Sequence, residues 1–159
     1  MKMLLAAALL LAWSLPCVAG ELQAFKHGRW QILRQSHAGK PMVVHFWGLT
    51  CGPCLSELPD WGKLAQERPN SNLVLIAADP SPVQPAAISA TLAKDGLSDT
   101  DNWVFDGFSE RLRYEVDPHW QGELPRTLLI GADGSVTAVD GVADLAVVRA
   151  WLDAREHVK

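Results

Sequence analysis

Two cysteines separated by only two residues are the most reactive feature of the sequence, in Cys51-Gly52-Pro53-Cys54. A thiol attacks a disulfide as its thiolate, which a helix N-terminus stabilises with unpaired N–H groups and the positive end of its dipole. In such settings the pKa of a cysteine can fall from about 8.5 to about 3.5–7.5. We therefore predict that Cys51 attacks and that Cys54, one helical turn later, resolves the mixed disulfide.

A Cys-x-x-Cys pair can also be half of a zinc site, which would need a second pair of ligands. The remaining cysteine, Cys17, lies in an N-terminal apolar segment, and the other histidines are scattered without metal-ligand spacing, at positions 27, 37, 119 and 157. A bridge that closes so small a loop stabilises a fold little, which indicates a pair used for chemistry. We expect neither a metal nor another cofactor. A non-catalytic copper- or zinc-binding protein that uses Cys51, Cys54 and His45 is the alternative.

The dithiol is predicted to lie where a central strand ends and a helix begins. Residues 42–47 are apolar apart from His45, which predicts a strand buried on both faces. Pro53 can begin a helix, and apolar residues at helical spacing predict that it continues to about residue 68. Further strands are predicted at 73–78, 103–105, 127–130 and 135–139, and further helices within 21–37 and over 85–94, 108–114 and 145–155. In the first of these helices, Trp30, Ile32 and Leu33 are expected to line one apolar face. This order predicts an α/β fold with a central mixed β-sheet flanked by helices on both faces.

The N-terminus has the pattern of a secretory signal peptide. Lys2 precedes an apolar run over residues 3–15, and Pro16 and small residues follow it. The run is shorter than the about 20 residues that a spanning helix needs. We predict a signal peptide at 1–20, one domain at 21–159 and a periplasmic location, with a membrane anchor facing the periplasm or a lipidated Cys17 as alternatives. Removal of the signal peptide would take Lys2 with it and leave 13 basic and 18 acidic residues. Because these basic residues form no stripe along the sequence, no nucleic-acid partner is expected.

The segment from Trp47 to Pro59 resembles the active site of thioredoxins, and in particular the TlpA/ResA-like branch of periplasmic and membrane-tethered thioredoxins. That branch has G-K-P before its first core strand, C-x-x-C-x-x-E-x-P at the site and L-P-x-T before a hairpin. The matching residues are 39–41, 51–59 and 124–127, in that order. The resemblance spans about residues 39–141 and implies a thioredoxin-like fold with a redox-active Cys51–Cys54 disulfide.

The resemblance also assigns roles around the dithiol. It implies a cis bond before Pro125, which would face the cysteines, and a carboxylate at Glu57 that influences proton transfer; a solvated helix glutamate is the alternative for Glu57. His45 replaces the acidic residue of thioredoxins proper, so it could move the proton of Cys54 or be a hydrogen-bonded core residue. Thr50 stands where most relatives have tryptophan. The partner groove is expected to include Trp47, Thr50, Gly52, Pro53 and Leu124, with Trp47 either core or site wall and Trp120 a further candidate.

The function implied is that of an exported disulfide reductase. A membrane electron donor of the DsbD/CcdA kind would keep the dithiol reduced, and the substrates would be extracytoplasmic proteins with disulfides, cytochrome c maturation proteins among them. The Gly-Pro pair matches reducing thioredoxins, whose potentials are about −270 mV against about −120 mV for the oxidant DsbA. A disulfide oxidase or isomerase with the same residues is the alternative.

Overall fold

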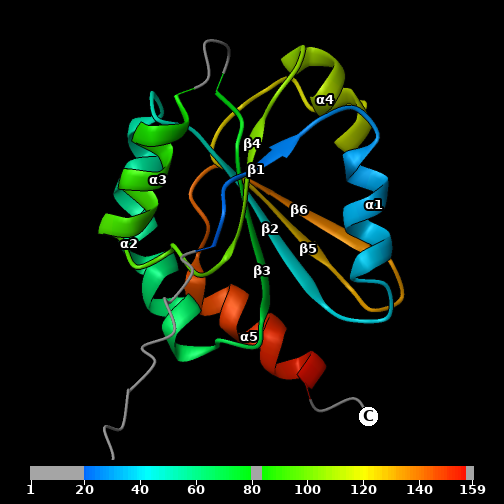
Figure 1. Cartoon of the computed structure of the whole chain (residues 1–159). Coiled ribbons are helices and arrows are strands. Elements are labelled where there is room, and N and C mark those ends of the chain that lie inside the picture. The colour runs from blue at the N-terminus through cyan, green and yellow to red at the C-terminus, as the bar shows by residue number, and fades with distance from the viewer. Residues whose placement is uncertain (1–19, 80–83, 157–159) are drawn as a thin grey trace, which may run out of the picture.

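A six-stranded sheet runs through the middle of the computed structural model, which describes residues 20–79 and 84–156 (Figure 1). The strand order is β1-β4-β3-β2-β5-β6. The strands are β1 (Gln23–Phe25), β2 (Met42–Trp47), β3 (Asn72–Ala77), β4 (Asp101–Phe105), β5 (Arg126–Ile130) and β6 (Val136–Asp140). The first four strands in this order pair in parallel, whereas β5 and β6 are antiparallel to their neighbours.

Helices cover both faces of the sheet, as the sequence predicted. They are α1 (Arg29–Ser36), α2 (Gly52–Glu67), α3 (Pro85–Lys94), α4 (Ser109–Val116) and α5 (Leu145–Glu156). One core cluster joins the sheet to α2, α3 and α5, and the other joins its opposite face to α1 and α4. In Figure 1, α2 and α3 lie on one side of the sheet and α1 and α4 on the other. The predicted mixed α/β architecture is confirmed.

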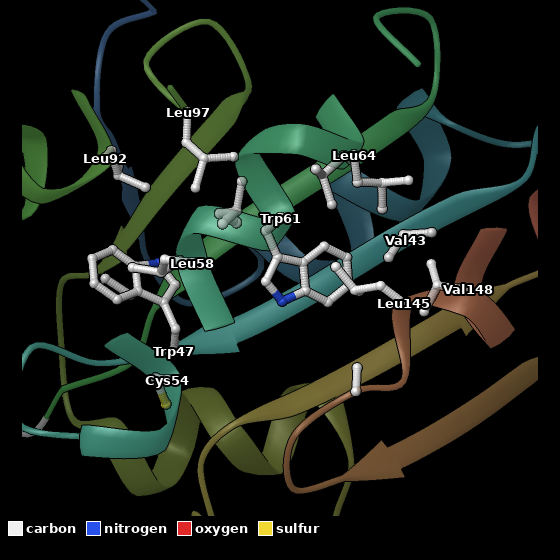
Figure 2. Close-up of a cluster of buried hydrophobic side chains, with 14 of the residues drawn as sticks. Val43, Trp47, Cys54, Leu58, Trp61, Leu64, Leu92, Leu97, Leu145 and Val148 are labelled. Atoms are coloured by element: carbon white, nitrogen blue, oxygen red, sulfur yellow. The ribbon is translucent and has the colours of Figure 1, made fainter. Parts of the chain in front are cut away.

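Strand β2 lies between β3 and β5, and all six of its residues are buried. Its side chains alternate between the two faces, so Val43 and Trp47 enter the core cluster under α2. Figure 2 shows these two residues with Leu58 and Trp61 of α2 and with Val148 of α5. The strand that leads to the dithiol is thus held from both faces.

The N-terminal part differs from the expectation in two respects. The sequence did not predict β1, because a three-residue strand with only Phe25 buried has no alternation to detect; it forms by parallel pairing with β4. Ile32 was expected on the apolar face of the first helix, but it is 52% exposed, whereas Trp30 and Leu33 are buried.

The predicted signal peptide lies almost wholly outside the described residues. Among the residues described, none of the helices combines the length and the apolar character needed to cross a membrane.

Candidate active site

The two cysteines form a disulfide at the start of α2, with their Cα atoms 5.2 Å apart. Cys51 is the residue that caps this helix, and its Sγ accepts a hydrogen bond from the backbone N–H of Cys54 at 3.2 Å. Cys54 is fully buried, whereas Cys51 is only partly buried. The sulfur that an incoming disulfide can reach therefore belongs to Cys51, and it already lies at the helix N-terminus, where a thiolate would be stabilised.

The loop before Cys51 is held by Asp79, which follows β3. Its carboxylate accepts hydrogen bonds from the backbone N–H of Leu49 at 2.8 Å and from the N–H and hydroxyl of Thr50, both at 3.3 Å. A Cβ atom on Gly48 would lie 2.7 Å from Asp79 Oδ1, so any side chain at this position would displace the carboxylate from the loop. The sequence did not identify Asp79, because parallel pairing of β2 with β3 brings it to this loop from 30 residues away.

Pro125 lies at the same end of the sheet as the dithiol. It directly precedes β5, which pairs with β2 in antiparallel register, so the start of β5 lies beside the end of β2. The Leu124–Pro125 bond is cis, as the resemblance implied, and Pro125 is buried. Its carbonyl oxygen accepts a hydrogen bond from the N–H of Gly141 at 2.9 Å. That Pro125 shapes the groove for a partner's cysteine stays a prediction.

A polar cluster is buried between β2, α2 and β5. His45 is fully buried; its Nδ1 lies 3.0 Å from the hydroxyl of Thr127, and its ring packs on Trp61 with ring centroids 4.5 Å apart. Its Nε2 lies 3.4 Å from Glu57 Oε1, close but not aligned as a hydrogen bond. The other carboxylate oxygen of Glu57 accepts a hydrogen bond from the backbone N–H of Ala143 at 3.1 Å. The alternative of a solvated glutamate is wrong, because Glu57 is only 6% exposed.

Burial shifts the pKa values of His45 and Glu57 in opposite directions. It lowers the pKa of His45 to about 3, since a charged imidazolium would have no water around it. It raises the pKa of Glu57, and the N–H groups of Ala143 and Trp61 only partly offset this. His45 is therefore neutral at neutral pH, with one nitrogen as donor and the other as acceptor. The pair can hold a proton one helical turn from Cys54, because Glu57 follows Cys54 by three residues on α2.

The residues expected to line the partner groove divide into two groups. Thr50, Gly52 and Pro53 are exposed, and Leu124 is partly buried. The prediction that Trp47 lines the groove is wrong. Trp47 is fully buried in the core under α2, so its ring cannot contact a partner. Trp120 is likewise a core residue, 4% exposed and packed on Phe46 with ring centroids 4.7 Å apart.

In the part of the chain that the structure describes, no group of three or more His, Cys, Asp or Glu side chains is arranged to hold a metal ion. Cys51, Cys54 and His45 thus do not form such a group. The Nδ1 atom of His45 is instead hydrogen-bonded to the hydroxyl of Thr127.

No protein-family model matches the chain. No curated protein matches it either. Several solved structures, by contrast, are similar to this chain. A secreted Mycobacterium tuberculosis disulfide oxidoreductase homologous to E. coli DsbE has a TM-score of 0.60 at 24% identity, over 76% of this chain and 85% of its own. StoA from Bacillus subtilis has a TM-score of 0.55 at 21% identity, over 72% and 83%. A thiol:disulfide interchange protein of the thioredoxin family from Chlorobium tepidum has a TM-score of 0.56 at 20% identity, over 77% of this chain and 83% of its own. The chain therefore has a thioredoxin-like fold, as predicted.

Proposed function

We propose that this protein is an exported thiol:disulfide oxidoreductase that acts as a reductase. The observation that carries the proposal is the Cys51–Cys54 disulfide at the start of α2, with Cys51 at the accessible helix N-terminus and Cys54 buried behind it. The names of the similar structures support it, since they include a disulfide oxidoreductase and a thiol:disulfide interchange protein. The signal-peptide pattern of the first 20 residues supports a periplasmic location.

The reaction begins with the reduced dithiol. The Cys51 thiolate attacks one sulfur of the substrate disulfide, forming a mixed disulfide and expelling the other substrate sulfur as a thiolate. Cys54 then loses its proton and attacks Cys51 Sγ, which forms the Cys51–Cys54 bond and releases the second substrate thiolate. Two electrons pass to the substrate, whose two thiolates take up protons. A membrane dithiol donor of the DsbD/CcdA kind would restore the reduced form by the same exchange.

Glu57 and His45 take part in the second step of this proposal. Cys54 is fully buried, so its proton has no direct path to water. Burial keeps His45 neutral and raises the pKa of Glu57, which makes the carboxylate a stronger base than an exposed glutamate. Glu57 is thus the proton acceptor for Cys54. The N–H of Ala143 holds one oxygen of its carboxylate, and neutral His45 lies 3.4 Å from the other.

Trapping of a reaction partner tests the proposal. In a Cys54→Ala variant expressed in the host envelope, Cys51 should remain covalently joined to its substrate, because no resolving thiol is present. The doubly substituted Cys51→Ala/Cys54→Ala variant is the control. Absence of any mixed disulfide with an envelope protein would contradict the exchange role. Recovery of cytochrome c maturation proteins would identify the substrates.

The direction of electron flow is tested by equilibration with glutathione. A reductase should have a potential near about −270 mV, as reducing thioredoxins do. A potential near the about −120 mV of DsbA would favour the oxidase or isomerase instead.

A further inference from the structure

Arg126 is a buried cation directly after Pro125, at a position that the L-P-x-T pattern leaves open. Its side chain is 7% exposed and contacts two carboxylates. One guanidinium nitrogen donates to Asp140 Oδ1 at 2.7 Å, and another donates to Asp117 Oδ2 at 2.5 Å. The guanidinium carbon also lies 5.6 Å from the centre of the Trp120 ring. Three residues from two separate segments of the chain therefore meet at the Arg126 side chain.

The contact with Asp117 anchors the segment that leads into Pro125. Asp117 is the residue at which α4 ends, and residues 117–125 connect that helix to β5. Trp120, in the middle of this segment, is buried and donates from its indole N–H to the carbonyl oxygen of Glu123 at 3.0 Å. The segment is thus held at its start by Arg126 and in its middle by Trp120.

The contact with Asp140 anchors the turn on the other side of Pro125. Asp140 is the last residue of β6, and the N–H of Gly141 donates to the carbonyl of Pro125. Two residues later, the N–H of Ala143 donates to buried Glu57. The turn at residues 141–143 therefore contacts both Pro125 and the proposed proton acceptor, Glu57.

We propose that Arg126 is a positioning residue that holds the Pro125 segment and the turn at 141–143 in one fixed arrangement for a protein substrate. The inference rests on the proposed oxidoreductase function. On this proposal, a protein disulfide would bring its flanking chain onto these segments, whereas a small disulfide would need access only to Cys51. Loss of the anchor should therefore weaken the reaction with proteins and spare the reaction with small disulfides.

The contacts also indicate that the fold tolerates removal of the guanidinium. The side chains of Asp117 and Asp140 are 28% and 61% exposed, so water can solvate both carboxylates once Arg126 is gone. The apolar stem can be replaced by methionine, which is flexible enough to fill the remaining space. The two segments then lose their common anchor while the sheet keeps its hydrogen bonds.

The test compares Arg126→Met with wild type in two assays, reduction of insulin and reduction of the small disulfide dithiobis(nitrobenzoate). For Arg126→Met, kcat/KM with insulin should fall about tenfold, mainly through KM, while the rate constant with the small disulfide stays within about twofold. Arg149→Met is the matched control, because Arg149 also pairs with a carboxylate, Glu67 at 2.8 Å, but joins α5 to α2. It should change neither rate.

Two further variants keep the inference testable. Arg126→Lys keeps the charge but lacks the planar fork that reaches two carboxylates, so its insulin activity should lie between those of wild type and Arg126→Met. Should Arg126→Met not fold, Asp140→Ala decides, since it removes one anchor at an exposed position; it should raise the KM for insulin about threefold and spare the small disulfide.

Equal losses with both substrates, or no loss with insulin, would overturn the positioning role. Wild-type protein inert towards both disulfides would instead refute the proposed function itself.

Discussion

Acidification should destabilise the oxidised protein, because His45 must stay uncharged while it is buried. The pKa of His45 is about 3 in the folded protein and about 6.5 in the unfolded chain. Below about pH 6.5 the unfolded chain binds a proton that the folded protein does not bind. The contribution of His45 is therefore fully present above that pH and is lost as the pH falls towards 3.

The magnitude follows from the pKa difference. Each pH unit is worth about 1.4 kcal/mol per proton, so the whole window corresponds to about 5 kcal/mol of unfolding free energy. Between about pH 7 and about pH 5, where most small domains remain folded, the loss from His45 is about 2 kcal/mol. Glu57 acts in the opposite direction, since its raised pKa stabilises the folded state below the pKa of the unfolded group.

The measurement is urea-induced unfolding of the oxidised protein at several pH values. Glu57→Gln removes the opposing titration, and comparison with the double variant His45→Asn/Glu57→Gln isolates His45. Burial alone lowers the pKa of His45, so the shift should persist without the glutamate. Any cavity left by asparagine lowers stability equally at every pH. The two curves should diverge by about 2 kcal/mol between about pH 7 and about pH 5. Parallel curves would refute the argument that the core holds His45 neutral.

Three further predictions concern single positions. Glu57→Gln should slow resolution of the mixed disulfide about tenfold or more at neutral pH while leaving Cys51 alkylation unchanged, as measured by rapid quenching; equal slowing of both steps would contradict its role as base. Asp79→Ala should cost about 1–2 kcal/mol in urea unfolding, and Asp79→Asn less, because an amide oxygen still accepts; equal costs would count against the loop contacts. Gly62→Ala should cost about 1–3 kcal/mol in thermal unfolding, because its Cβ would lie 1.8 Å from the carbonyl oxygen of Asp95, whereas Gly52→Ala, with no atom within 4 Å, should change little.

The order of elements and the place of the dithiol could be predicted from the sequence. The apolar run at 42–47 and the helical spacing after Pro53 are local patterns, and the structure has β2 at Met42–Trp47 and α2 at Gly52–Glu67. Local patterns report which residues a strand or helix buries, so the strand–helix junction at Cys51 was visible in the sequence. A short strand such as β1 was not visible, because its partner β4 lies far along the chain.

Only the tertiary structure decided which side chains surround that junction. His45 meets Thr127 across 82 residues, and Glu57 meets the N–H of Ala143 across 86. Asp79 reaches the loop before Cys51 through the register of β2 with β3, and Arg126 reaches two carboxylates because α4 and β6 end beside it. The cysteines and their chemistry are properties of a short stretch of sequence. The burial that shifts the pKa values of Glu57 and His45, and the anchors that hold Pro125, exist only when distant segments pack together.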